Sequence, residues 1–142
     1  MRIVFGTDED TPLTADVVAE LRAQGHEVEH LAAGEQWPEV GRAVGEAVAG
    51  GRAERGVVCC WTGTGVSMVA NKVPGVRAAL CTDAATAAGA RRWNDANVLA
   101  FGLRLTSAEL AREMIDAFLG AEPDAAELPV IARVERTPGS LG

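Results

Sequence analysis

The chain has 142 residues and 48% of them are hydrophobic, so it is long and apolar enough for one domain with a core and is not a disordered chain. Its formal net charge of −7 argues against a nucleic-acid partner, because phosphates are bound by basic surfaces, although a local basic site for a small anion stays open. No apolar run reaches the length of a membrane span and no signal peptide precedes the first strand-like segment, so we expect a cytoplasmic protein without a membrane partner.

Strand-like apolar segments alternate with helix-like segments along most of the chain. The first helix has the clearest end signals, with Thr11 as N-cap, Pro12 at its first position and Gly25 after its last turn. The expected strands are residues 2–6, 26–31, 56–60, 76–81 and 97–101. The expected helices between and after them are residues 12–24, 37–49, a helix starting at Met68, 82–92 and 107–119. This order predicts an α/β domain over residues 1–120, with a five-stranded, mostly parallel sheet and helices on both faces. The tail, residues 121–142, has no clear period, and we expect it to pack on a partner subunit.

The segment from Cys59 to Ser67 has the strongest chemical signal, because it follows a short apolar strand and leads into a helix. It places a thiol, Cys60, at the carboxyl end of a strand, where open α/β sheets hold their ligands. The glycines of its Gly-Thr-Gly turn let the backbone approach a ligand, and free N–H groups at a helix start favour an oxyanion. We therefore expect a nucleophile or base beside an oxyanion cradle.

The three cysteines, Cys59, Cys60 and Cys81, favour neither disulfides nor a metal site. An odd count without a signal peptide argues against structural disulfides, and the chain has no Cys-x-x-Cys motif and no histidine cluster for zinc. Neighbouring strand residues point to opposite faces, so Cys59 and Cys60 are expected in different surroundings. Cys59 and Cys81 are expected in the core.

Four motifs stand out together: Cys-Trp-Thr-Gly-Thr-Gly-Val-Ser at 60–67, Ala-Asn-Lys-Val at 70–73, Gly-Val-Arg-Ala-Ala at 75–79 and Asn-Asp-Ala-Asn-Val-Leu-Ala at 94–100. With them the chain resembles the type B ribose-5-phosphate isomerases, a family that includes the subunits of galactose-6-phosphate isomerase. The resemblance implies a Rossmann-like, three-layer α/β/α sandwich and a homodimer, often paired into tetramers, with the site at the subunit interface. It also implies a carbohydrate isomerase that interconverts an aldose and a ketose through an enediolate, without metal or cofactor.

The resemblance implies a role for each matching residue. Cys60 stands at the family's base position, Asp8 matches an aspartate that binds sugar hydroxyls, and Asn94 matches an asparagine that comes from the partner subunit. Proton removal beside a carbonyl needs such a base together with donors for the enediolate oxygen, and a helix start favours the thiolate. The expected site residues are Cys60 and Thr62 for catalysis, and Asp8, Glu9, Trp61, Gly63, Thr64, Gly65, Val66, Ser67, Trp93, Asn94, Arg104 and Arg133 for substrate binding.

Three features depart from the family pattern. Glu9 stands where the family has a histidine that helps to hold the phosphate, and a carboxylate repels a phosphate. Trp93 stands where family members have a histidine that opens the sugar ring, and indole does not titrate. The tail lacks the family's Gly-Gly-Arg-His stretch, although Arg133 matches a second phosphate-binding arginine and Arg104 is retained. Neither of the two histidines, which we expect on one face of the second strand near solvent, fits the ring-opening position.

Simpler roles stay open for several residues. Cys60 as an inert core thiol, the two glycines as only a tight turn, and Trp93 as interface packing are the alternatives. Arg91 and Arg92 are expected as surface or interface charges that add positive charge locally. Three functions remain: an isomerase of the type B kind, an isomerase of a non-phosphorylated or modified sugar, and a catalytically weak sugar-binding subunit. Glu9 and the altered tail favour the second, whereas Cys60 with its cradle favours an enzyme.

Overall fold

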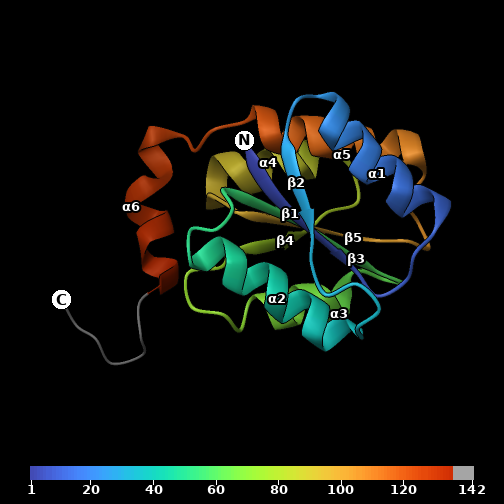
Figure 1. Ribbon diagram of the computed structural model, residues 1–142. Coiled ribbons are helices and arrows are strands. Elements are labelled where there is room, and N and C mark those ends of the chain that lie inside the picture. The colour runs from blue at the N-terminus through green and yellow to red at the C-terminus, as the bar shows by residue number, and fades with distance from the viewer. Residues whose placement is uncertain (136–142) are drawn as a thin grey trace.

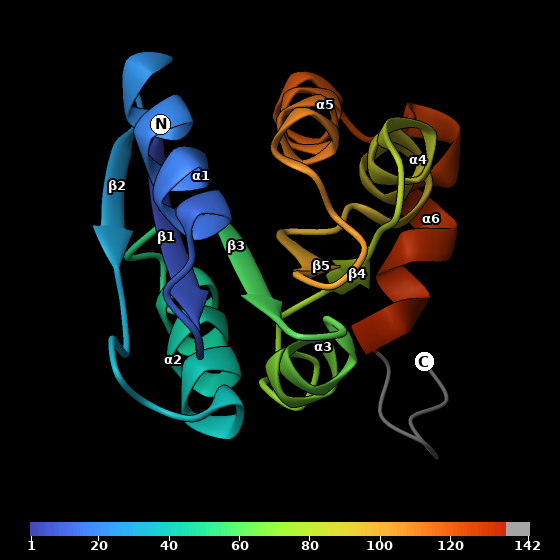
Figure 2. The same ribbon diagram turned by 90° about the vertical axis from the view of Figure 1, so that its right-hand side faces the viewer.

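Five parallel strands form the central sheet, in the order β2-β1-β3-β5-β4 (Figure 2). The strands are β1 (Arg2–Thr7), β2 (Glu27–His30), β3 (Arg55–Cys60), β4 (Ala78–Leu80) and β5 (Val98–Gly102). The computed structural model describes residues 1–135. Every strand pairing in it is parallel, so the predicted α/β sheet is confirmed, and its central strand is β3.

Helices cover both faces of the sheet (Figure 1). One layer holds α2 (Trp37–Ala49) and α3 (Thr64–Ala70); the other holds α1 (Pro12–Ala23), α4 (Ala84–Asn94) and α5 (Ala108–Gly120). Side chains alternate between two apolar clusters, so Cys60 of β3 packs in the layer of α2 and α3, and Cys59 packs in the layer of α1, α4 and α5. The predicted three-layer sandwich is confirmed, and the two neighbouring thiols do face opposite layers.

The ends of α1 follow the sequence signals closely. The Thr11 hydroxyl accepts the Thr14 N–H, and the Thr14 hydroxyl accepts the Thr11 N–H, which makes a reciprocal cap at the first turn. Gly25 follows the helix with a φ of +89°, a left-handed conformation that glycine adopts without strain. This helix therefore leaves the end of β1 in a fixed direction, which positions the loop that carries Asp8.

Two helix boundaries correct the sequence prediction. The third helix begins at Thr64, directly after the cap residue Gly63, and Met68 lies inside it. The fourth helix is capped by Asp83 and continues to Asn94, so Trp93 and Asn94 belong to its last turn. The glycine-rich turn hid the first boundary, because Gly63 and Gly65 have low helix propensity.

The tail forms short helices after α5: η1 (Ala125–Glu127), α6 (Leu128–Ile131) and η2 (Ala132–Glu135). They contact the same subunit, since the Asp124 N–H donates to the Arg92 carbonyl and Arg77 pairs with Glu135 at 2.8 Å. Packing of the tail on a partner stays a prediction, and its part at 136–142 lies outside the described residues.

The prediction that Arg91 is a surface or interface charge is wrong, because its side chain is buried, with 1% exposed. Its Nη1 donates to Asp95 and to the Ala96 carbonyl, each at 2.7 Å, and its guanidinium lies 5.8 Å from the centre of the Phe118 ring. A buried guanidinium with these partners is a structural group that ties α4 to α5. It adds no charge to a phosphate site.

Candidate active site

The crevice for a ligand lies at the carboxyl ends of β1 and β3. From β1 the chain runs to β2, which is the neighbour of β1 on one side, and from β2 it crosses back to β3, which is the neighbour on the other side. The connections that follow β1 and β3 therefore diverge between these two strands. Such divergence points hold ligands in open α/β sheets. Thr7 is opposite Cys59 in the parallel register, so Asp8 and Cys60 follow as neighbours at this edge.

Two glycines fix the turn between β3 and α3. Gly63 has a φ of +78°, and a Cβ there would lie 2.6 Å from both the Phe101 carbonyl carbon and the Leu80 Cδ1. A Cβ on Gly102 would lie 2.7 Å from the Thr62 backbone. The loops after β3 and β5 therefore approach each other so closely that only glycine fits at either position.

Backbone hydrogen bonds join the same two loops. The Leu103 N–H donates to the Cys60 carbonyl at 2.9 Å, and the Arg104 N–H donates to the Trp61 carbonyl at 2.9 Å. Arg104 and Trp61 are both exposed. The structure thus brings Arg104 to the predicted site loop, where its guanidinium is a cation for an anionic group of a ligand.

The expected oxyanion cradle is the first turn of α3. The N–H groups of Thr64, Gly65 and Val66 have no partner within the helix, as in any first turn. The Ser67 N–H donates to the Gly63 carbonyl at 3.3 Å, and its hydroxyl donates to the Thr64 carbonyl at 2.8 Å. The cradle is therefore shorter than the sequence suggested, because Ser67 stabilises the turn and does not offer its N–H to a ligand.

The three thiols differ in what they can do. Burial raises the pKa of Cys59 to about 12 and that of Cys81 to about 11, so both are protonated at neutral pH and are packing groups, as expected. Cys60 is 6% exposed and ends β3 directly before the cradle. Position alone therefore distinguishes Cys60 as the thiol that can meet a ligand.

Asp8 and Glu9 occupy the loop after β1. The Asp8 Oδ1 is buried and accepts no hydrogen bond from the described residues. The Thr7 hydroxyl donates to the Glu9 carbonyl at 2.8 Å and fixes the course of this loop. A buried carboxylate oxygen without a donor is costly, so Asp8 has the property of a group held ready for a ligand hydroxyl. Glu9 is exposed.

Two indoles and a hydroxyl pair surround the cradle. Trp37, at the start of α2, packs so closely on Gly65 that a Cβ there would lie 2.8 Å from its ring. Trp61 is 57% exposed, and the Thr62 and Thr64 hydroxyls lie 2.7 Å apart. From the sequence, Trp37 was expected only as one of three tryptophans on which a sugar could stack, and the structure places its ring against the first turn of α3. The site therefore has apolar walls beside polar groups, as sugar sites do.

Three predicted residues lie away from this edge. Trp93 and Asn94 end α4, which runs back from the carboxyl end of β4 toward the start of β5. They lie near the amino edge of the sheet, a strand length of about 16 Å from Cys60. Arg133 is exposed on η2, whose Glu135 pairs with Arg77 directly before β4, at the amino edge of the sheet. One subunit therefore does not bring Asn94, Trp93 or Arg133 to its own cradle.

The remaining motif asparagines are structural. Asn71 donates to the Ala78 carbonyl at 2.9 Å and accepts the Ala78 N–H at 2.8 Å, which holds β4 in place. Asn97 accepts the Arg77 N–H at 2.8 Å and donates to the Gly75 carbonyl at 2.9 Å. The interpretation of Asn71 as a backbone partner is confirmed.

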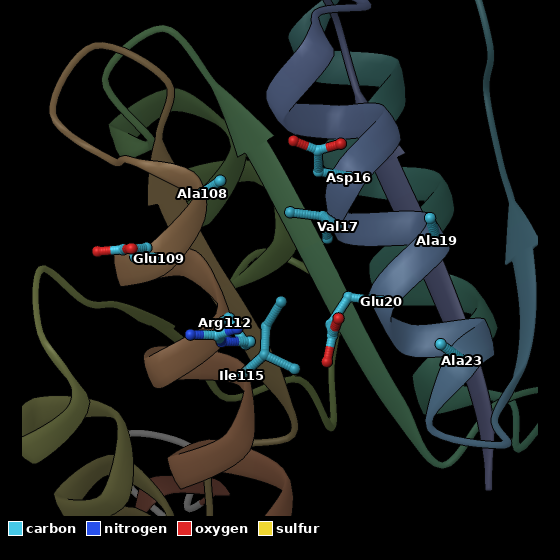
Figure 3. A pocket seen from close by; sticks show the side chains of 9 residues that line it. All are labelled: Asp16, Val17, Ala19, Glu20, Ala23, Ala108, Glu109, Arg112 and Ile115. Carbon is cyan, nitrogen blue, oxygen red and sulfur yellow. The ribbon is translucent and has the colours of Figure 1, made fainter.

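A cavity of about 370 Å³ lies between α1 and α5, on the face of the sheet opposite Cys60 (Figure 3). Val17 and Ile115 form its apolar floor, and Asp16, Glu20 and Glu109 are acidic groups around it. It opens in the layer of Cys59 and contains none of the residues at the carboxyl end of β3. It is not the predicted site.

A model of the Ribose/Galactose Isomerase family matches residues 3–135. Ribose-5-phosphate isomerase B of Escherichia coli is 40% identical over 126 residues, which cover 85% of each chain. D-erythrulose-4-phosphate isomerase of Pectobacterium atrosepticum is 45% identical over 86 residues, which cover 61% of this chain and 57% of that one. The solved ribose-5-phosphate isomerase B of Clostridium thermocellum superposes with a TM-score of 0.90 at 35% identity over 95% of both chains.

The chain therefore belongs to the ribose/galactose isomerase family, and the predicted family and fold are confirmed. The expected aldose–ketose isomerase activity agrees with every one of these relatives. Within residues 1–135 we find no helix with the length and apolar character needed to cross a bilayer.

Proposed function

We propose that the protein isomerises a sugar phosphate with Cys60 as the base, in a site completed by a second subunit. The observation that supports this most strongly is the position of Cys60, which ends the central strand beside the orphaned Asp8 carboxylate and directly before the cradle. The names of the relatives support a phosphorylated substrate, and they include both a five-carbon and a four-carbon sugar.

The reaction requires one proton to move between two adjacent carbons and a second proton to move between the oxygens on those carbons. The Cys60 thiolate removes the proton from the carbon beside the carbonyl, and the electron pair moves to the carbonyl oxygen to give an enediolate. The N–H groups of Thr64, Gly65 and Val66 stabilise that oxygen. The hydroxyl on the carbon that lost its proton gives its own proton to the enediolate oxygen, while Cys60 returns the abstracted proton to the former carbonyl carbon. Asp8 binds a sugar hydroxyl.

Arg104 is the proposed phosphate ligand within the subunit, since its backbone is joined to Trp61 at the site edge. Glu9 lies on the loop opposite and opposes a phosphate placed there, so the phosphate is expected on the Arg104 side. Arg133 is the proposed second ligand, contributed by the partner subunit. The expected cytoplasmic location stays a prediction that cell fractionation checks.

The second subunit is proposed because Trp93 and Asn94 lie at the other end of the sheet in this chain. A twofold dimer places the end of α4 of one copy at the cradle of the other. Sedimentation should give at least a dimer at micromolar concentration, and a stable, active monomer would contradict this part of the proposal.

Proton exchange tests the proposed chemistry directly. We expect the protein to exchange the proton beside the carbonyl with deuterated water, followed by NMR, for at least one of a panel of ketose and aldose phosphates of four to six carbons. The same sugars without phosphate are the control, and they should exchange slowly. Exchange that prefers the non-phosphorylated sugars would overturn the phosphate assignment, and exchange that survives Cys60→Ala would overturn the assignment of the base.

A further inference from the structure

We propose that Lys72, acting from the partner subunit, is the acid that opens the ring of a cyclic sugar phosphate in this site. The proposal rests on the proposed function and adds a catalytic residue to it. Two observations support it. The chain has few groups that can donate a proton, and Lys72 lines the same pocket as Asn94, the residue that the proposed dimer brings to the cradle of the second copy.

Opening a sugar ring needs two proton transfers beyond those of the isomerisation. A donor protonates the ring oxygen as the bond from the first carbon to that oxygen breaks, and an acceptor removes the proton of the hydroxyl on the first carbon. At neutral pH the donor is an imidazole, an ammonium, a phenol or a thiol. An ionised carboxylate only accepts, and a guanidinium does not release its proton, so no arginine fits the donor.

The chain contains few donors of these kinds. It has two histidines, one lysine, three cysteines and no tyrosine, and an assembly of identical subunits adds only further copies of them. Cys60 is used for the carbon-bound proton, and Cys59 and Cys81 are buried in the layer on the other side of the sheet. The donor, in whichever subunit, therefore has to be a histidine, the lysine or the amino terminus.

The histidines and the amino terminus lie away from the cradle of their own subunit. The His26 Nδ1 lies 3.1 Å from the amino-terminal nitrogen, before β2 and thus at the amino edge of the sheet. His30 ends β2, where its ring packs edge-on against Phe5 at a centroid distance of 5.2 Å, in the layer opposite Cys60. Its Nε2 is buried, so the expectation of a solvent-facing His30 is corrected.

The copies of these groups in a partner are equally distant. The strand order is β2-β1-β3-β5-β4, so four strand spacings, about 19 Å, separate β2 from β4. Asn94 lines a pocket beside β4. A partner that brings Asn94 to the cradle therefore keeps its histidines and its amino terminus on the far side of its own sheet. Lys72 is the donor that remains.

Lys72 lies in the pocket of Asn94. This pocket has a volume of about 710 Å³ and is formed by the residues after α3, by β4, by the end of α4 and by the tail. The Asn71 side chain donates to the Ala78 carbonyl at 2.9 Å and accepts the Ala78 N–H at 2.8 Å, which fixes the backbone beside Lys72 against β4. The pocket therefore presents Lys72 and Asn94 together.

Lys72 is also the cation of this pocket that is available to a ligand. The Arg77 guanidinium donates to the Asp95 carbonyl at 2.8 Å and pairs with Glu135 at 2.8 Å. Lys72 is exposed and forms no salt bridge within residues 1–135. In its own subunit about 10 Å of helix separates it from Gly63, because α3 is seven residues long. The dimer is what brings this ammonium to a cradle.

The proposed step balances its protons and electrons. The Lys72 ammonium gives a proton to the ring oxygen, which takes the electron pair of the breaking bond and becomes a hydroxyl. The Asp8 carboxylate, whose buried Oδ1 has no donor among the described residues, takes the proton of the hydroxyl on the first carbon, and that oxygen becomes the carbonyl. The amine and the protonated carboxyl group then return to their starting forms by exchange with water.

Two substrates and two variants test the proposal. D-ribose 5-phosphate is cyclic, and D-ribulose 5-phosphate is the matched open-chain probe. Lys72→Met and Lys72→Arg should both lower kcat/KM for ribose 5-phosphate by at least about 100-fold, the low end for loss of a positioned acid, and leave ribulose 5-phosphate nearly unchanged. Arg112→Met, which removes an exposed cation on α5, is the control and should change neither (Figure 3).

The dependence of rate on enzyme concentration gives a second readout. With Lys72→Met, the ribose 5-phosphate rate should reach a plateau at the uncatalysed rate of ring opening, measured separately by NMR. The rate of the unsubstituted protein should stay proportional to enzyme beyond that value. A plateau for the unsubstituted protein as well overturns the proposal and leaves the isomerase assignment intact.

Mixed dimers test whether Lys72 acts from the partner. Cys60→Ala refolded with Lys72→Met should regain about a quarter of the ribose 5-phosphate activity, because half of the dimers are mixed and each has one intact site. Asn94→Ala refolded with Lys72→Met should regain none, because both residues come from the same side. Recovery in the second mixture, or none in the first, overturns action from the partner.

The remaining outcomes also decide the matter. Equal losses with both sugars assign Lys72 a structural role, and full rescue by Lys72→Arg assigns it to charge alone, as for a phosphate ligand; either result overturns the proposal. Turnover of neither five-carbon sugar overturns it too, because ring opening then has no substrate. If none of the sugar phosphates of four to six carbons exchanges its proton, the proposed function itself is overturned.

Discussion

The carboxyl end of β3 and the last turn of α4 both carry motifs of the family, yet they are built very differently. At the end of β3, backbone hydrogen bonds from Leu103 and Arg104 and the tight contacts of Gly63 and Gly102 fix each group. At the end of α4, Trp93 and Asn94 are exposed and lie at the opposite edge of the sheet. The comparison teaches that tight backbone contacts fix the loop at the end of β3, whereas the residues of α4 that we propose to complete a partner's site face outward from their own subunit.

The largest effect is expected from the base. Cys60→Ala should lower kcat by about 10³-fold or more, because loss of a positioned base typically removes 10²–10⁴-fold of the rate. Cys59→Ala is the matched control, since Cys59 is the neighbouring buried thiol on the other face of the sheet. It should retain turnover while lowering stability. Steady-state kinetics with thermal unfolding of both variants checks this, and equal losses of turnover would contradict the distinction between the two thiols.

A smaller but clear effect is expected from the turn itself. Gly63→Ala forces a Cβ against the Phe101 backbone at a φ of +78° and should cost at least about 2 kcal/mol of unfolding free energy. Gly25→Ala has a similar φ of +89° but open space around it, so it should cost only the backbone strain of about 1 kcal/mol. Denaturant unfolding measures both. If the two variants are equally stable, the close approach of the loops is not real.

A substitution of Asp8 is expected to lower activity without lowering stability. Asp8→Asn should reduce kcat/KM by roughly thirtyfold, the scale of a hydrogen bond to a charged group of about 2 kcal/mol. It should not lower the unfolding free energy, because the buried Oδ1 has no donor among the described residues to lose. Asp10→Asn, two residues further along the same loop, is the control and should leave kinetics unchanged. A parallel loss of stability in Asp8→Asn would assign the carboxylate a structural role.

The smallest effect is expected at the start of α4. Hydrogen bonds from the side chain and the backbone N–H of Thr86 hold the pKa of Asp83 below its usual range. A carboxylate whose folded pKa is depressed stabilises the fold above its unfolded pKa, and this contribution disappears as pH falls through the folded pKa. Asp83→Ala should therefore lower Tm by a few degrees at pH 7 and by less in acid. If the difference in Tm between Asp83→Ala and the unsubstituted protein stays the same as the pH falls through this acidic range, the Asp83 cap is excluded.

Local signals in the sequence predicted most of the elements. The helix of residues 37–49 has the predicted bounds, and the Thr11 cap and the Gly25 stop lie where the residues indicated. The alternation of apolar residues placed Cys59 and Cys60 on opposite faces. These features depend on neighbours in the chain, which a single sequence contains.

Features that depend on distant contacts were not predictable in the same way. The order of the strands, the burial of Arg91 against Phe118 and the interlocking of Gly63 with Gly102 each join segments far apart in the sequence. The start of α3 was misplaced because glycine disfavours helices locally, while tertiary packing fixes the turn. The motif brought the candidate residues at the β3 edge together, and those assignments stay predictions. The resemblance already implied that Asn94 acts from a partner subunit, and the structure adds that Asn94 ends α4, away from the end of β3.

Subunit complementation tests the central claim, that the cradle of each subunit meets the end of α4 from a second copy. Cys60→Ala and Asn94→Ala should each have little activity alone. When the two are unfolded together and refolded at equal amounts, half of the dimers are mixed and each mixed dimer has one intact site, so we expect about a quarter of wild-type activity. Activity that stays at the level of the single variants, in a mixture shown to contain mixed dimers, would contradict a shared site.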